Sequence, residues 1–192
     1  MKNIYYKLKP NSLSRRALLQ IYLLALALLN FLLNLLPFSS WKKLICICLG
    51  VHLGSNVTIC SNVRFLSFGK CSIGDRTIIN RNCVIDNRCG IEIANDVSIS
   101  MNVIILTQGH NSEGDDFSLK GNKVIIDHHV CVYANSMIMP GIILSEGCVV
   151  YPGSIVTKSF PRNSIVAGHP AICIKDRNSN LSYQLNSNFW FS

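Results

Sequence analysis

Charged residues are scarce in this sequence: they make up 15% of its 192 residues, whereas hydrophobic residues make up 49%. The few charges are unbalanced, because 18 Lys and Arg face 10 Asp and Glu and give a net charge of +8. This excess favours anionic partners such as acidic lipid headgroups or a phosphate-bearing cofactor. The basic residues are scattered and no base-stacking motif accompanies them, so we expect no nucleic-acid partner.

The sequence also lacks the features of a disulfide scaffold or a metal centre. Its nine cysteines form an odd-numbered set, and most occupy positions where a small apolar residue suits the repeat described below. We interpret them as reduced packing residues of a cytosolic protein. Cys46 and Cys48 are too close together for a normal metal pair, and no histidine cluster completes a site. We therefore expect no metal.

A long apolar run, residues 17–38, precedes the rest of the chain and ends at Pro37. As a helix it would be roughly 33 Å long, which is enough to span a bilayer. Its few polar residues share one narrow face with two residues before it: Ser12, Arg16, Gln20, Asn30 and Asn34. We interpret residues 11–38 as an amphipathic helix on a membrane surface. A true span, or a helix packed on its own protein or an oligomer partner, stays open.

Cations flank the apolar run on both sides: Lys7, Lys9, Arg15 and Arg16 before it, and Lys42 and Lys43 after it. They suit the acidic cytoplasmic leaflet of a membrane. A signal peptide is not expected, since no small-x-small cleavage site follows and the cysteines argue against export. The predicted location is the cytoplasm, peripheral at the cytoplasmic face of the inner membrane.

From Leu53 onward an aliphatic residue leads nearly every six-residue piece of the chain. The leading residues fall in strict step near the end of the series: Ile126, Val132, Ile138, Leu144, Val150 and Val156. Six is the period of a parallel β-helix whose coils have three short faces, with Asn and Gly at the corners. An antiparallel sheet would need hairpin-turn signals, which are almost absent.

The rhythm therefore predicts a mainly β protein with a parallel β-helix over residues 51–177. An N-terminal hydrophobic helical segment, residues 1–50, precedes it, and a short tail, residues 178–192, follows it.

One long insertion, residues 107–123, interrupts the repeat and carries His110 near its start. Histidine is the side chain best suited to remove a proton near neutral pH, so His110 is the candidate general base. A solvated loop histidine with no chemical role is the alternative.

Several motifs carry a family resemblance: Asn80-Arg-Asn-Cys-Val-Ile-Asp86, Gly109-His110, Met139-Pro-Gly141, Gly153-Ser-Ile-Val-Thr-Lys158 and Ile165-Val-Ala-Gly-His-Pro-Ala171. Over roughly residues 50–177 the chain resembles the left-handed β-helix (hexapeptide-repeat) acyltransferases. Within that family it is similar to the sugar and glycan O-acetyltransferases of the galactoside, maltose, capsule and colanic-acid types. The resemblance implies acetyl-CoA as acyl donor and a homotrimer with active sites between subunits.

The resemblance also implies roles for single residues. His110 matches the catalytic histidine and Asn80 the acceptor-binding asparagine, and Asp86 is a candidate to hold a sugar hydroxyl or to orient the base. Turn roles for Asn80 and Asp86 stay open. The implied cofactor contacts are Ala134 and Pro152 beside the pantetheine arm, Thr157 and Lys158 near the adenosine 3′-phosphate, and Lys175 near the phosphates. The chain departs from the family pattern at Cys131, Tyr133, Tyr151 and His169.

The implied function is transfer of an acetyl group to a hydroxyl of a cell-surface glycan (O-antigen, capsule or exopolysaccharide) or its sugar precursor. Two alternatives remain. A xenobiotic, antibiotic-modifying O-acetyltransferase usually lacks so apolar a leading segment, and a non-catalytic β-helix scaffold would not be expected to keep His110.

Overall fold

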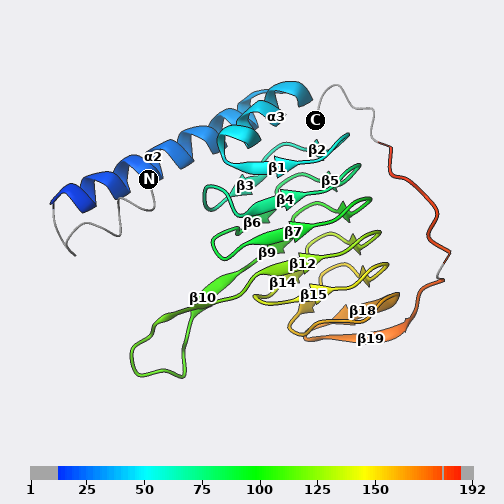
Figure 1. Ribbon diagram of the computed structural model, residues 1–192. Coiled ribbons are helices and arrows are strands. Elements are labelled where there is room, and N and C mark those ends of the chain that lie inside the picture. Colours follow the sequence, from blue (N-terminus) through cyan, green and yellow to red (C-terminus); the bar gives the residue numbers. More distant parts are fainter. Residues whose placement is uncertain (1–12, 179, 187–192) are drawn as a thin grey trace.

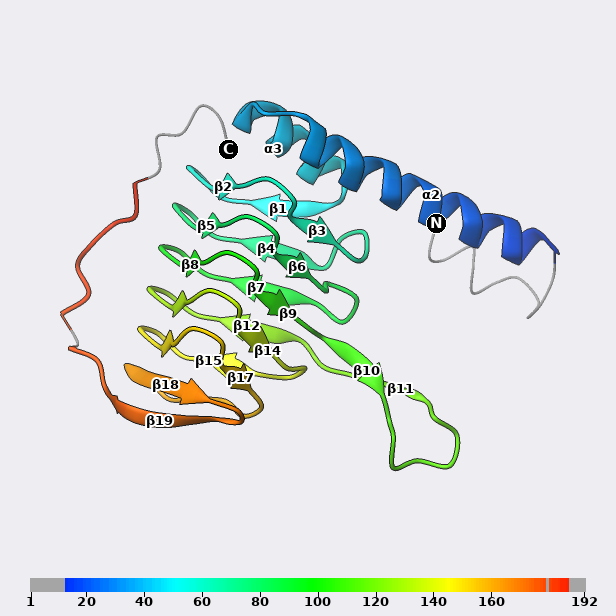
Figure 2. The same cartoon turned by 180° about the vertical axis from the view of Figure 1, so that it is seen from behind.

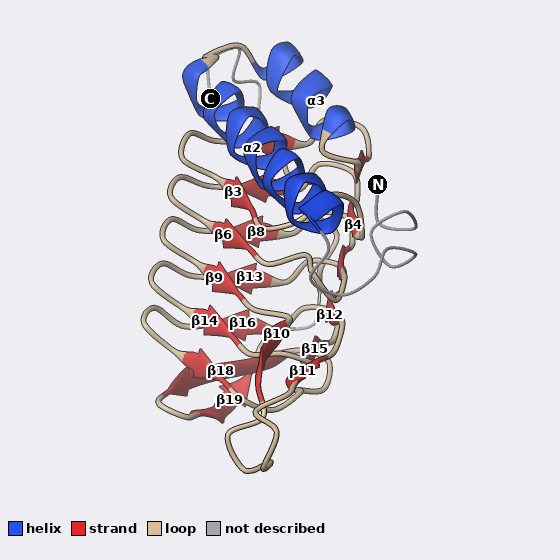
Figure 3. Cartoon of the chain, turned by 90° about the vertical axis from the view of Figure 1, so that its left-hand side faces the viewer, coloured by secondary structure: helices blue, strands red, loops and turns tan. Residues whose placement is uncertain are grey.

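The computed structural model describes residues 13–178 and 180–186, which form a β-solenoid with two helices across one end (Figure 1). The helices are α2 (Leu13–Leu35) and α3 (Ser39–Cys48). They lie side by side over the first coil, as the view from the side shows (Figure 3). The predicted β-helix with a helical N-terminal segment is confirmed.

Three parallel sheets form the sides of the solenoid, each with one strand from every coil. The first sheet contains β1 (Val51–Leu53), β4 (Cys71–Ile73), β7 (Ile91–Ile93), β12 (Val124–Ile126) and β15 (Ile143–Leu144). The second contains β2 (Thr58–Ile59), β5 (Ile78–Ile79), β8 (Ser98–Ile99), β13 (Cys131–Val132) and β16 (Val149–Val150), extended by β18 (Ser164–Gly168) and β19 (Ala171–Asp176). The third contains β3 (Arg64–Phe65), β6 (Val84–Ile85), β9 (Ile104–Ile105), β14 (Met137–Ile138) and β17 (Ile155–Val156).

The core is the stack of leading aliphatic residues that the six-residue rhythm predicted. In the second sheet, Ile79, Ile99, Val132 and Val150 pair in register and are fully buried. Each coil places its aliphatic side chain directly above that of the coil before, so apolar surface is buried continuously along the axis.

The corner between the second and third sheets is built from stacked asparagines. Asn62, Asn82, Asn102 and Asn135 all have φ between 59° and 62°. Asn82 accepts a side-chain hydrogen bond from Asn62 (3.0 Å) and donates one to Asn102 (3.1 Å), which donates to Asn135 (3.0 Å). Asparagine tolerates this left-handed backbone and links neighbouring coils at the same time.

All insertions into the repeat fall at one corner, between the third sheet and the first sheet of the next coil. Cys71 pairs with Val51 and Ile91 with Cys71, so the first two coils are twenty residues long, whereas Leu144 follows its partner Ile126 by only eighteen positions. The third coil inserts a hairpin at this corner, β10 (Gln108–His110) with β11 (Leu119–Gly121). The hairpin projects far from the solenoid (Figure 2).

Helix α2 packs on the first coil through its polar residues. Asn30 accepts a hydrogen bond from the backbone N–H of Phe65 (2.9 Å) and donates one to the carbonyl oxygen of the same residue (3.0 Å). The Tyr22 hydroxyl lies 2.9 Å from the Ser67 hydroxyl. Part of the predicted polar stripe therefore faces the protein, as the alternative of a helix packed on its own chain proposed.

The tail after β19 returns along the corner between the first and second sheets. Arg177 donates hydrogen bonds to the carbonyl oxygens of His129 (2.9 Å) and Gly147 (3.2 Å). Further along, the backbone N–H of Leu185 donates to the Asp96 carboxylate (2.9 Å). The tail covers this corner in Figure 1, which leaves the other two corners open. The aromatic residues near the end of the tail, Phe189, Trp190 and Phe191, lie outside the described residues.

Replacing Asn30 by alanine should destabilise the fold by about 1–3 kcal/mol, because both backbone groups of Phe65 lose their partner at a partly buried position. Urea denaturation measures the change, with Gln20→Ala as the control, since Gln20 lies exposed on the same helix. Equal stability of the two variants would contradict this role for Asn30.

Candidate functional site

The hairpin positions His110 through a hydrogen bond to one of its ring nitrogens. His110 pairs with Leu119 across the hairpin, and its Nδ1 lies 2.8 Å from the carbonyl oxygen of Phe117. The imidazole stacks on the Phe117 ring, with centroids 4.4 Å apart and planes 5° from parallel. A carbonyl oxygen can only accept, so Nδ1 carries the hydrogen and the neutral ring keeps its lone pair on Nε2. The side chain is exposed and can meet a substrate.

The base of the hairpin is fixed to the preceding coil by Thr107. This side chain is fully buried, and its hydroxyl donates to the carbonyl oxygen of Asp86 (2.7 Å) and accepts from the backbone N–H of Cys89 (3.0 Å). The backbone N–H of Thr107 donates to the Asp86 carboxylate (3.1 Å). The strand that leads to His110 therefore starts from a rigid point.

Asp86 is part of this support. Its side chain is fully buried, and Arg88 binds its two oxygens with Nε and Nη2 at 2.7 Å and 2.9 Å. Burial alone would raise the pKa of the Asp86 carboxyl, but hydrogen bonds from Arg88 and Thr107 outweigh it and hold this pKa below its usual value. Both carboxylate oxygens already accept hydrogen bonds within the chain, which favours the alternative role of supporting the base, and the contact with a sugar hydroxyl stays a prediction.

Arg88 extends the network into the hairpin itself. Its Nη2 lies 3.4 Å from the carbonyl oxygen of Gln108, two residues before His110. Neither Arg88 nor Thr107 was a candidate from the sequence. The one available signal was the spacing of Asp86 and Arg88, which allows an ion pair across a tight corner.

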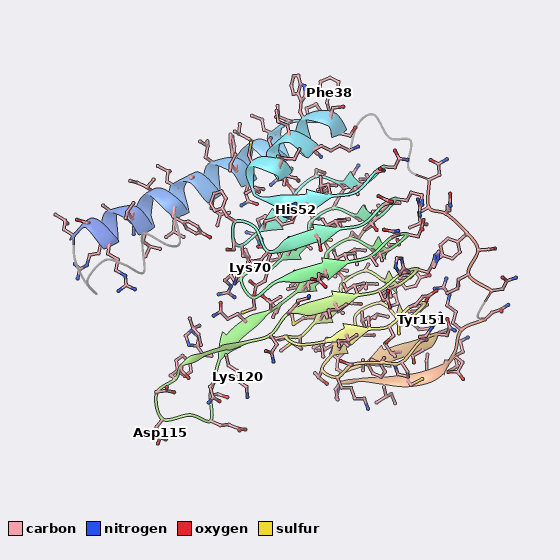
Figure 4. All side chains as sticks on the ribbon, in the orientation of Figure 1. Phe38, His52, Lys70, Asp115, Lys120 and Tyr151 are labelled. Carbon is pink, nitrogen blue, oxygen red and sulfur yellow. The ribbon has the colours of Figure 1, made fainter. Side chains whose placement is uncertain are left out.

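Asn80 lies at a different corner from His110. The backbone hydrogen bonds that link successive coils stack Asn80, Ser100, Tyr133 and Tyr151 between the second and third sheets. Figure 4 shows Tyr151 far from the hairpin residues Asp115 and Lys120. One chain therefore does not bring Asn80 and His110 together, and the Asn80 carboxamide oxygen accepts from the backbone N–H of Arg81 (3.0 Å).

The candidate cofactor residues also divide between two corners. Ala134 and Pro152 share the corner of Asn80, where the backbone N–H of Gly153 donates to the Ala134 carbonyl oxygen (2.9 Å). Thr157 and Lys158 are exposed at the corner that carries the hairpin. A ligand that touches all four residues must cross the third sheet or lie between two copies of the chain.

The basic candidates fit a ligand with phosphates. Lys158 and Lys175 are exposed, and neither forms an ion pair with a carboxylate among residues 13–178 and 180–186. The Lys158 ammonium lies 5.7 Å from the centre of the Phe160 ring. Lys175 stands on β19 opposite Ile165. Unpaired ammonium groups at an open edge are suited to bind phosphate.

Comparison with known proteins assigns this chain to a family. No family model matches the chain. The Escherichia coli K12 protein WbbJ, named as a lipopolysaccharide biosynthesis O-acetyl transferase, is 30% identical over 142 residues, which cover 67% of this chain and 72% of WbbJ. The chain belongs to the hexapeptide-repeat acetyltransferases.

Two further proteins agree with this assignment. WcaF of Escherichia coli K12, named for colanic acid biosynthesis, is 25% identical over 137 residues, or 71% of this chain and 75% of WcaF. A hexapeptide-repeat acetyltransferase from Vibrio cholerae, solved with acetyl coenzyme A, has the same fold with a TM-score of 0.77 at 22% identity. The structural match covers 88% of this chain and 92% of the Vibrio cholerae chain. The chain is an acetyl-CoA-dependent acetyltransferase.

Four buried thiols of this acetyltransferase are poor nucleophiles. All nine cysteines are free. Burial raises the pKa of Cys46 and Cys71 to about 12 and the pKa of Cys83 and Cys148 to about 11. Since the thiolate is the reactive form, these four residues pack the core and do not form an acyl-enzyme.

A metal centre is not evident in the described part of this acetyltransferase. Within residues 13–178 and 180–186, no group of three or more His, Cys, Asp or Glu side chains is arranged to hold an ion. His128 and His129 lie at the corner between the first and second sheets, where the His129 ring packs against Tyr183 with centroids 5.0 Å apart.

Two of the residues that depart from the family pattern, Tyr133 and Tyr151, lie at the corner of Asn80. The rings of Tyr133 and Tyr151 meet edge to face, with centroids 6.3 Å apart. They are adjacent in the chain to Ala134 and Pro152, so they add aromatic surface beside these two candidate cofactor residues.

Asp86→Asn should destabilise the protein by about 1–3 kcal/mol at neutral pH, because the ion pair with Arg88 is lost. The pKa of Asp86 is lower in the folded chain than in the unfolded one, so its contribution is present above about pH 4 and is lost as the pH falls further. Urea denaturation between neutral and acid pH should therefore show the two proteins converging in acid.

The matched control is Glu113→Gln, since Glu113 is an exposed carboxylate at the tip of the same hairpin. It should be as stable as the unmodified protein at neutral pH. A constant stability difference between the Asp86→Asn variant and the unmodified protein at every pH would contradict the ion-pair assignment.

Proposed function

We propose that this acetyltransferase modifies a hydroxyl of a cell-surface glycan (O-antigen, capsule or exopolysaccharide) or of its sugar precursor, with His110 as general base. The observation that carries the proposal is the hydrogen bond of His110 Nδ1 to the Phe117 carbonyl oxygen, which leaves Nε2 free to accept a proton. The names of WbbJ and WcaF support a glycan acceptor, since both refer to polysaccharide biosynthesis.

In this mechanism His110 acts on the acceptor within a ternary complex. Bound acetyl-CoA supplies an acetyl thioester that is open to attack by an alcohol. His110 Nε2 takes the hydroxyl proton as the acceptor oxygen attacks, and the Nδ1–H bond to the Phe117 carbonyl oxygen stabilises the imidazolium that forms. Stacking on Phe117 keeps the ring from rotating. The proton on Nε2 can then pass to the leaving group.

We further propose that the active site is completed by a second copy of the chain in a homotrimer. Asn80, Ala134 and Pro152 occupy one corner, while His110, Thr157 and Lys158 occupy another. The tail already covers the third corner through Arg177. A neighbour that joins the two open corners would gather the acceptor, base and cofactor residues in one groove.

The face between these two corners has the composition of a subunit interface. The outward residues of the third sheet form a partly exposed apolar row: Val84, Ile104, Met137 and Ile155. An apolar row on a solenoid face favours burial against another subunit.

Replacing His110 by alanine should lower kcat by about 100-fold to 10,000-fold, because general base catalysis is lost. The affinity for acetyl-CoA should change far less than kcat, since the proposed role of His110 is to take the proton of the acceptor hydroxyl, whereas other residues hold the cofactor. Turnover with a purified glycan acceptor and mass spectrometry of surface glycans measure the effect; cells with the variant should lack the same acetyl group as cells without the gene.

The matched control is His52→Ala, because His52 is an exposed histidine on the first coil (Figure 4). It should retain normal activity. Undiminished turnover by the His110→Ala variant would rule out the base assignment.

The shared site predicts complementation between two inactive variants. Asn80→Ala and His110→Ala should each be nearly inactive, but co-expression in equal amounts should restore activity at about a quarter of all sites, because both native residues meet at one interface of each mixed trimer. Activity per chain in the purified mixture checks this. No recovery, with mixed oligomers shown to form, would place both residues in the site of a single chain.

A further inference from the structure

The outward face of helix α2 is apolar along its length. Five residues spaced three or four positions apart are each at least 55% exposed: Ile21, Leu24, Leu28, Phe31 and Leu35. This spacing puts them on one side of the helix. The polar residue Asn30 instead faces the first coil, so the amphipathic pattern of a soluble surface helix is reversed.

Helix α3 continues this apolar surface. Phe38, Trp41, Leu44 and Ile47 follow one another at intervals of three and are 42–64% exposed. The rings of Phe38 and Trp41 meet edge to face, with centroids 5.1 Å apart. Figure 4 shows Phe38 directed away from the solenoid. We call these four residues and the five on α2 the cap face.

Charge is distributed unevenly around the cap face. The first acidic residue of the chain is Asp75; the 74 residues before it contain nine Lys and Arg and no Asp or Glu. The remaining 118 residues contain nine Lys and Arg and ten Asp and Glu. The first 74 residues therefore carry all of the net positive charge, and six of their nine cations lie in the helices or the first coil: Arg15, Arg16, Lys42, Lys43, Arg64 and Lys70. This charge attracts an anionic surface.

The contacts of α2 with the first coil exclude a membrane span for this fold. By length and composition alone α2 could cross a bilayer. Crossing would detach Asn30 from both backbone groups of Phe65 and Tyr22 from Ser67. It would also expose Leu33, which is fully buried. A helix held along one side can only lie flat.

We propose that the cap face docks on the surface of an anionic lipid bilayer, with α2 and α3 lying in the interface. Exposed Trp41 and Phe38 suit the headgroup region, where aromatic rings concentrate. A second copy of the cap face is the less favourable occupant, because two caps that carry the same positive charge repel each other.

Flotation with lipid vesicles tests the proposal on the full chain. Purified protein is mixed with vesicles of phosphatidylcholine alone or with added phosphatidylglycerol and separated on a density gradient. The protein should float with the anionic vesicles, less at high salt and less with phosphatidylcholine alone. Leu24→Glu/Leu28→Glu should reduce vesicle binding by about tenfold or more, since two charges enter the apolar face.

The matched control is Ile172→Glu/Ile174→Glu, which adds the same charges at exposed apolar positions on β19, at the far end of the solenoid (Figure 1). Its flotation should equal that of the unmodified protein. A second measurement uses the fluorescence of the Trp190→Phe variant, in which Trp41 is the single tryptophan. Brominated lipids should quench its fluorescence if α3 enters the interface.

Four outcomes would overturn the proposal. They are no flotation with anionic vesicles, flotation unchanged by Leu24→Glu/Leu28→Glu, no quenching of Trp41, and retention in vesicles after an alkaline carbonate wash. The last would show a spanning helix. A protein that binds no vesicles but loses a higher oligomer in the double variant would show that the cap face joins copies of the chain.

Discussion

Each coil of this solenoid must hydrogen bond to the coil before it and the coil after it, and the two ends have no next coil. An open sheet edge invites pairing with other chains, so both ends need a cover. At the first coil the side chain of Asn30 pairs with the backbone N–H and carbonyl oxygen of Phe65. At the last coil β18 turns back into antiparallel β19, which closes the second sheet. The positions of the helices and the tail follow from this requirement.

The corner between the third sheet and the first sheet of the next coil shows how the repeat can support a catalytic residue. In the first coil the backbone N–H of Ser67 donates to the Asn87 carboxamide (2.8 Å), which in turn donates to the Ser67 carbonyl oxygen (2.8 Å). One coil further, Thr107 is held by Asp86 at the root of the hairpin. A stack of buried, satisfied polar groups thus supports the strand that bears His110, and the hairpin can project without loosening the coils.

The sequence was sufficient to predict the coils and the place of the hairpin, because both depend on a local period. The step from Ile126 to Val156 is six throughout, and the insertion at residues 107–123 is far longer than any other interruption of the repeat. The environment of Asp86 could not be predicted, since its partner Thr107 lies 21 positions away and meets it only when two corners stack. The same limit applies to Asn30 and Phe65, 35 positions apart.

The separation of Asn80 from His110 has the same origin. The two residues are thirty positions apart, and this spacing alone does not show which corner each occupies. The corner of each depends on how many residues the intervening coil inserts. Sequence distance therefore locates a residue on the solenoid only after every insertion has been assigned to a corner.

The two proposed surfaces lie on different parts of the solenoid and do not compete. The apolar row of the third sheet runs along a side, whereas the cap face covers one end (Figure 3). Subunits that pack side by side with parallel axes would present their caps to one plane. Three weak lipid contacts would then act together, because the second and third bind at a high effective concentration once the first has formed. Assembly and membrane docking would therefore reinforce each other, and the exposed leucines of α2 need not bind lipid strongly in a single chain.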